Sequence, residues 1–288
     1  ETWCQRIYQP SSLLIVHLGD TATLQCFFSK EEKYISWFKQ NFGQKPRIIA
    51  FTEKNSEPVF HNEFNTSKRF EIQKRNGSNH LMISKTEHSD SAVYYCGRMK
   101  DFIMLFGTGT FLSIKGSENQ RSNNRTVVQQ VVSDPMHPGD SHRDPEMLSY
   151  AALHFADTTA KRGGKKRELK DENRTWSDEI YQPSSFLAVH LGDTATLECF
   201  FSKDERYISW FKQTAAEKPH IIAFTEKYLE PVFYNEFNTS KRFKIQRRDR
   251  SNHLMISKTE HSDSAVYYCG RMKDFIMLFG TGTFLSIK

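Results

Sequence analysis

The 288-residue sequence has no long apolar segment, little net charge and few cysteines. Its longest purely apolar run is about five residues, at 102–106, whereas a membrane-spanning helix needs about 20. The formal net charge of +6 disfavours a dedicated nucleic-acid-binding protein. The five cysteines leave one without a partner in the chain. The sequence starts at Glu1, without an initiator Met or the apolar core of a signal peptide, so we expect a processed or incomplete form.

The sequence repeats itself. Hydrophobic residues make up 38% and charged residues 26%, as in a soluble globular protein, and the length favours two domains. A shift of 173 places residues 3–115 on residues 176–288 without a gap, with about 93 of 113 positions identical. We therefore predict one domain at 1–115, a second at 174–288, and a linker at 116–173 that is mostly disordered.

Each copy has the pattern of an all-β domain. Residues 21–26, 81–84 and 92–96 alternate with period two, which predicts strands with one buried and one wet face. Turn residues separate such runs, and no stretch of ten residues sustains a helical period. A copy of this length built from such strands is a sandwich or a small barrel.

Cysteine and tryptophan spacing favours the sandwich. Cys26 is followed by Trp37 and, seventy residues on, by Cys96; the second copy has Cys199, Trp210 and Cys269 at the same spacing. Cysteines on opposite sheets of a sandwich can be bridged, with an indole packed against the bridge. The alternative is a pair of buried thiols in a cytosolic protein. A disulfide that closes a loop of this length contributes about 4 kcal/mol to the stability of the fold in the chain-entropy model.

Further motifs resemble immunoglobulin V-type domains. Residues 90–96 (Asp-Ser-Ala-Val-Tyr-Tyr-Cys) look like the strand-F signature, 37–40 (Trp-Phe-Lys-Gln) the strand-C signature, and 106–110 (Phe-Gly-Thr-Gly-Thr) the joining segment of antigen-receptor variable domains. All recur 173 residues later, so the resemblance covers about four-fifths of the chain. It implies two V-type β-sandwiches with a tyrosine corner and an arginine–aspartate pair. The structural residues implied are Trp37, Trp210, Arg69, Asp90, Tyr94, Arg242, Asp263 and Tyr267.

The third hypervariable-like loop is the candidate ligand-binding segment, because loop tips on a rigid sandwich carry binding. In the two copies, the predicted ligand-binding residues are Arg98, Met99, Lys100, Asp101, Phe102, Arg271, Met272, Lys273, Asp274 and Phe275. As an alternative, Phe102 and Met104 point inward to close the core, or form a face on which two V domains pair.

The linker contains a possible signalling motif. Leu148, Tyr150 and Leu153 fit the inhibitory tyrosine motif, and residues 144–155 resemble the cytoplasmic tail of novel immune-type receptors of bony fishes. Residues 127–141 look like the start of another immunoglobulin domain, and the sequence then changes character at about Ser141–His142. We infer that a second ectodomain and a membrane span are missing there, because disulfides require export whereas Tyr150 requires a cytosolic kinase. In a chain exported intact, Tyr150 is inert.

Export is also consistent with five N-glycosylation sequons, at Asn65, Asn76, Asn124, Asn173 and Asn238, although several would occur by chance. The leftover Cys4, which is Ser177 in the second copy, could cross-link chains, pair with the missing region or stay free. The basic run at 161–170 could bind acidic lipid or nucleic acid, but is more typical of a solvated tail.

We predict no enzymatic activity, no bound metal and no cofactor. Ser, His and Asp at 89, 88 and 90 are sequential neighbours and cannot form an aligned triad. The predicted function is therefore a cell-surface immune receptor that binds a protein ligand through V-domain loops. A membrane-bound form would signal through a phosphotyrosine-reading phosphatase. The alternative is a secreted or adhesive V-domain module that binds through its sheet face, without signalling.

Overall fold

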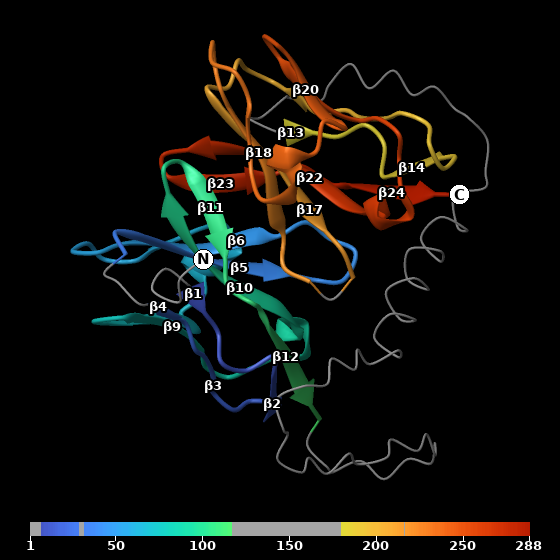
Figure 1. Cartoon of the computed structure of the whole chain (residues 1–288). Helices are drawn as coiled ribbons and strands as arrows, with labels where there is room; N and C mark the ends of the chain where they lie inside the picture. Colours follow the sequence, from blue (N-terminus) through green and yellow to red (C-terminus); the bar gives the residue numbers. More distant parts are fainter. Residues whose placement is uncertain (1–6, 29–31, 117–179, 216) are drawn as a thin grey trace, which may run out of the picture.

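The computed structural model describes residues 7–28, 32–116, 180–215 and 217–288. These residues form two β-sandwiches that lie against each other (Figure 1), residues 7–116 in the first and 180–288 in the second. The prediction of an all-β protein built of two sandwiches is confirmed.

The first sandwich pairs a five-stranded with a seven-stranded sheet. One sheet has the order β1-β4-β9-β3, with β8 paired to β9; the other has the order β2-β12-β10-β5-β6-β7, with β11 paired to β10. Only β2 and β12 pair in parallel; the other registers are antiparallel. The elements are β1 (Ile7–Tyr8), β2 (Leu13–His17), β3 (Ala22–Leu24), β4 (Phe27–Phe28), β5 (Tyr34–Gln40), β6 (Arg47–Glu53), β7 (Val59–Phe60), α1 (Glu63–Thr66), β8 (Phe70–Arg75), β9 (Ser78–Ile83), the 3-10 turn η2 (His88–Asp90), β10 (Ala92–Lys100), β11 (Ile103–Phe106) and β12 (Thr110–Lys115).

The second sandwich repeats this topology strand for strand. Its elements are β13 (Ile180–Tyr181), β14 (Phe186–Val189), β15 (Ala195–Leu197), β16 (Phe200–Phe201), β17 (Tyr207–Gln213), β18 (His220–Glu226), β19 (Val232–Phe233), α3 (Glu236–Thr239), β20 (Phe243–Arg248), β21 (Ser251–Ile256), η3 (His261–Asp263), β22 (Ala265–Lys273), β23 (Ile276–Phe279) and β24 (Thr283–Ile287).

Strand β3 shows how the period-two pattern builds each core. Ala22 and Leu24 are buried between the sheets, while Thr23 faces solvent. The same alternation in the other strands gives each sandwich a separate core around its cysteine pair. Alternating apolar residues therefore specify the two sheets, because only one face of each needs to leave water.

Strand β10 departs from this pattern. Its alternation predicted one wet face, yet eight of its nine residues are buried or half-buried. Tyr95, on the face expected to be wet, is 4% exposed. The physical reason is that the outer face of the seven-stranded sheet is covered by the other sandwich.

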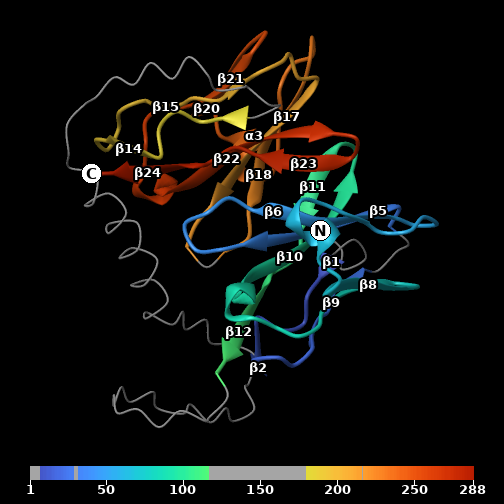
Figure 2. The same cartoon turned by 180° about the vertical axis from the view of Figure 1, so that it is seen from behind.

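A third apolar cluster fills the space between the two sandwiches. It joins Phe38, Tyr95 and Phe106 of the first to residues of the second, including Phe211 and Phe279. Figure 2 shows the two seven-stranded sheets facing each other, with β11 beside β18 and β23 beside β6, in agreement with their contacts. The two copies are thus paired face to face within one chain.

Candidate functional site

A disulfide and a tryptophan tie the two sheets of each sandwich together. Cys26 and Cys96 are bonded, with their Cα atoms 6.3 Å apart, and so are Cys199 and Cys269. The fully buried Trp37 donates its indole N–H to Asn79 Oδ1 at 2.9 Å. Both cysteine pairs are therefore bridged as predicted, and the alternative of two buried thiols is excluded.

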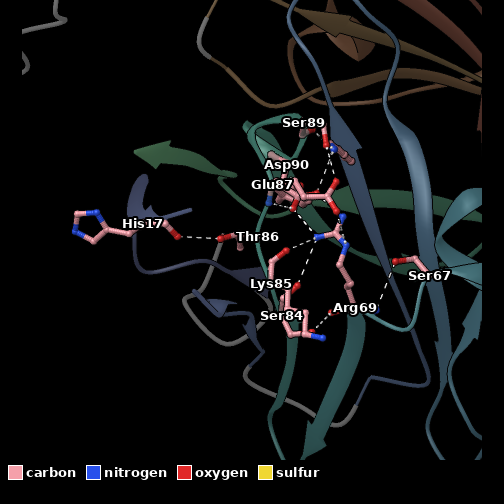
Figure 3. A network of polar contacts seen from close by, with 11 residues as sticks. His17, Ser67, Arg69, Ser84, Lys85, Thr86, Glu87, Ser89 and Asp90 are labelled. Atoms are coloured by element: carbon pink, nitrogen blue, oxygen red, sulfur yellow. Dashed lines mark hydrogen bonds and ion pairs between the residues drawn. The ribbon is translucent and has the colours of Figure 1, made fainter. Parts of the chain in front are cut away.

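The predicted arginine–aspartate pair forms at the end of the sandwich where β10 begins (Figure 3). Arg69 Nη1 lies 2.7 Å from Asp90 Oδ2, and the same oxygen accepts the backbone N–H of Glu87 at 2.8 Å. Hydrogen bonding to Asp90 raises the pKa of the Arg69 guanidinium. Tyr94 donates its hydroxyl to the Asp90 carbonyl oxygen at 2.8 Å, and burial raises its pKa. Arg242, Asp263 and Tyr267 repeat this network in the second copy.

Gln9 is a structural residue that carries no sequence motif. Its buried amide accepts the backbone N–H of Cys96 at 3.0 Å and donates to the Tyr94 carbonyl oxygen at 2.9 Å. It also accepts the N–H of Gly109, whose φ of +88° only glycine adopts without strain. Gln9 thereby fastens the bulged 106–110 segment to β10.

Reciprocal hydrogen bonds span the face between the two copies, which we call the pairing face. The amides of Gln40 and Gln213 bond each other in both directions, at 2.9 and 3.0 Å. Gln40 also donates to the hydroxyl of Tyr268 at 3.3 Å, and Gln213 to that of Tyr95 at 3.2 Å. Each contact has a mirror image, so the pairing face has the self-complementarity of a two-fold interface.

Two lysines extend this symmetry across the pairing face. Lys45 donates to the carbonyl oxygen of Phe279, and Lys218 to that of Phe106, each at 2.9 Å. Both carbonyls stand at the start of the bulged segments. A lysine of each sandwich thus bonds the bulged segment of the other sandwich. Within its own sandwich, that segment is bonded by Gln9 in the first copy and by Gln182 in the second.

Stacked aromatic rings cross the pairing face at the opposite end. Phe102 stacks on Tyr207 and Phe275 on Tyr34, with ring centroids 4.5 Å apart in both pairs. The two phenylalanines also stack on each other at 6.2 Å. The third loops of both sandwiches therefore meet, and the two loop ends point the same way.

The third loop turns tightly at Asp101 and Phe102, both with positive φ. Lys100 and Asp101 are exposed and Phe102 is 40% exposed, whereas Arg98 and Met99 are buried. The second copy has the same arrangement at 271–275. A role for this loop in ligand binding stays a prediction, and its accessible part is the tip. The alternative interpretation was a face on which two V domains pair, and Phe102 lies on such a face.

Arg98 is buried because it bonds Glu32 Oε1, at 3.1 Å, and Arg271 bonds Glu205 Oε1 at 3.0 Å. A charge that leaves water is stabilised by such a partner. Both arginines thus connect the third loop to the first loop of the same sandwich, rather than projecting toward a ligand.

Three predicted sequons fall on described residues, and the side chains of Asn65, Asn76 and Asn238 are all exposed. Asn124, Asn173 and the tyrosine motif Leu148, Tyr150 and Leu153 lie outside the described residues, as does Cys4. Among the residues that the structure describes, no helix is long and apolar enough to span a membrane.

Two sandwiches whose sheets are bridged by a disulfide, each with a tryptophan against the bridge and a tyrosine corner, define the class: variable-type immunoglobulin domains. The chain belongs to this family, since the model of the immunoglobulin V-set domain matches residues 8–115 and 181–288. It is similar to the T-cell receptor alpha chain V region 2B4 of Mus musculus, with 32% identity over 118 residues, covering 38% of this chain and 84% of that relative. The finer resemblance to novel immune-type receptors is not tested by these similarities.

Proposed function

We propose that this chain is the recognition part of an immune receptor, displayed at a cell surface or secreted, that binds a protein ligand with the loops of both V domains. The observation that carries the proposal is the meeting of the two third loops, with Phe102 and Phe275 stacked at the centre. Pairing of this kind makes one composite surface from two sets of loops. The similarity to a T-cell receptor V region supports the assignment to an immune receptor.

The accessible centre of this composite surface consists of Lys100 and Asp101 with their counterparts Lys273 and Asp274, all exposed. Burial raises the pKa of Tyr234 in the second domain, and Asp101 lies close enough to this tyrosine that its charge raises the pKa further. A protein ligand would meet two positive and two negative side chains around an apolar centre. Charged rims around a desolvated core are typical of protein–protein interfaces.

Reporter cells that display the full chain on a signalling tail, screened against cells expressing a surface-protein library, test this proposal. Once a ligand is isolated, replacing Lys100, Asp101, Lys273 and Asp274 by alanine should weaken its binding at least about tenfold, an effect typical of hot-spot residues. Lys68→Ala is the matched control, because this exposed lysine lies beside Arg69, at the other end of β10. Failure of the whole library, or a ligand indifferent to the four substitutions, contradicts the proposal.

We further propose that a membrane-bound form signals inhibition through Leu148, Tyr150 and Leu153. Support comes from the sequence motif and from the resemblance of its flanks to a receptor tail. Sequencing cDNA across Ser141–His142 tests this idea. A transcript with an inserted membrane span is expected, and its absence rules out cytosolic signalling by this gene product.

The alternative function, adhesion through the sheet face, has less support. In this chain that face is already occupied, because Phe38, Phe106, Phe211 and Phe279 bury it between the two copies. Adhesion to a second chain would first require the intrachain pair to open.

A further inference from the structure

The first V domain has a groove that the pairing leaves untouched. It has a volume of about 290 Å³ and lies between the β4–β5, β6–β7 and β8–β9 connections. Phe28 and Ile35 form its apolar part, and Thr52, Glu53 and Asn55 contribute polar groups. A groove of this size and mixed lining is close to the lower limit of small-ligand sites, about 300 Å³.

A sequon stands at the rim of the groove. Asn76 and Gly77 form the two-residue connection between β8 and β9, in which Arg75 pairs with Ser78. Asn76 is exposed and is itself one of the residues that line the groove. The other described sequons of this protein, Asn65 and Asn238, lie within the short helices α1 and α3 and do not line the groove.

The second V domain fills the corresponding space with one of its own side chains. The Arg247 guanidinium donates to the carbonyl oxygens of Glu205, Arg206 and Thr225, the latter two at 3.4 Å. The counterparts of these three residues in the first domain are Glu32, Lys33 and Thr52, all of which line the groove. The place that Arg247 occupies is therefore the interior of the groove.

The first domain cannot fill its groove in this way. Its counterpart of Arg247 is Lys74, whose ammonium instead donates to the carbonyl oxygen of Ser56. In the second domain the sequon is also absent, because Asp249 and Arg250 replace Asn76 and Gly77. The open groove and the sequon thus occur together in one copy, and the arginine-filled corner without a sequon in the other.

We propose that Asn76 is N-glycosylated in the exported chain and that the first N-acetylglucosamine of the glycan lies in the groove of the first domain. The donor is an oligosaccharide linked to a polyisoprenyl diphosphate. The Asn76 amide nitrogen forms a bond to C1 of the sugar, the bond from C1 to the diphosphate oxygen breaks, and an amide proton is lost. Hydroxyl and acetamide groups of the sugar match the polar lining, and its apolar ring face matches Phe28.

Export is the only premise shared with the receptor function, and the two disulfides support it. The test uses the full chain secreted from eukaryotic cells. Mass spectrometry of glycopeptides should find Asn76 occupied. Hydrogen exchange of peptides covering residues 32–35 and 52–56 should be about tenfold slower in the glycosylated chain than in the Asn76→Asp variant. Trimming the glycan to its first sugar should leave this protection in place.

Matched variants separate the groove from general glycan effects. Asn65→Gln removes the other sequon of the same domain and should not change exchange at the groove. Lys74→Arg in the Asn76→Asp background introduces the arginine of the second domain and should restore protection. Exchange in β10 of the first domain reports whether each variant is folded. An unoccupied Asn76, or groove exchange that is the same with and without the glycan, overturns the proposal, as does an arginine that restores nothing.

Discussion

The first and second V domains are nearly identical in sequence, and one corner is among the places where they differ. The side chains that bond across the pairing face, such as Gln40, Tyr95 and Phe102, have the same identity in both copies. In contrast, Lys33, Asn55, Lys74, Asn76 and Gly77, which line the groove, all differ from their counterparts. The two copies thus share one fold and one pairing face, and the corner beside the groove is one place where their surfaces diverge.

The second domain also exposes apolar groups at this corner. Tyr228 and Leu229, which replace Asn55 and Ser56, are 89% and 63% exposed. Below them, Arg206 bonds Glu226 at 2.8 Å and Lys227 pairs with Asp204. The corner of the second domain is therefore apolar at its tip, whereas that of the first has a groove with a mixed lining.

The disulfides should give the largest effect, and the same effect in both domains. Replacing Cys26 and Cys96 by alanine should lower the free energy of unfolding of the first domain by about 4 kcal/mol, because each bond closes a loop of 70 residues. Replacing Cys199 and Cys269 should do the same to the second. Hydrogen exchange resolved by domain measures both. Clearly unequal losses would show that the two cores are not equivalent.

The ion pair at the end of β10 should come next. Arg69→Ala leaves the Asp90 carboxylate, 2% exposed, without its main partner, and should cost about 3 kcal/mol. Arg242→Ala should cost the same in the second domain, where Asp263 is equally buried. Urea unfolding followed by domain-resolved exchange measures the two values. An Arg69→Lys variant that recovers less than half of the loss would indicate that the forked geometry matters as well as the charge.

The motifs predicted these parts of the molecule well, for a physical reason. Cys26 bonds Cys96, and Arg69 pairs with Asp90, inside one sandwich, so the motif and the contact belong to the same domain. The sequence did not predict that the outer face of β10 is buried, because Tyr95 in an alternating strand fits either a wet or a covered face. From the sequence, pairing of the two V domains was only an alternative interpretation of Phe102 and Met104.

The groove could not be predicted either. It depends on the path of a single side chain, since Arg247 folds into the corner whereas Lys74 reaches Ser56. Lysine and arginine at one position in a strand give no signal of that choice. Gln9 was missed for a similar reason, because a lone glutamine near the start of a domain has no motif around it.

Alkaline pH should weaken the pairing face. Burial raises the pKa of Tyr95 and Tyr268 above the value of 10.0 for a free tyrosine. Because the folded-state pKa is raised, their contribution is fully present below about pH 10 and is lost as the pH rises above it. Fluorescence energy transfer between dyes on the two domains should fall above pH 10. Tyr95→Phe with Tyr268→Phe should shift this fall to higher pH, and an unshifted fall would assign it to other groups.

The smallest effect should be found at the corner where the domains differ. Tyr228 adopts a φ of +70°, whereas the Asn55 backbone of the first domain does not enter the positive region. Asparagine tolerates this conformation better than tyrosine, so Tyr228→Asn with Leu229→Ser should stabilise the second domain, by about 0.5 kcal/mol. The reverse exchange, Asn55→Tyr with Ser56→Leu, should leave the first domain within about 0.5 kcal/mol of its original stability. Thermal unfolding of the original chain, of each exchange alone and of both exchanges together measures these changes in stability. A clear loss of stability in the second domain would mean that packing holds Tyr228 in this conformation.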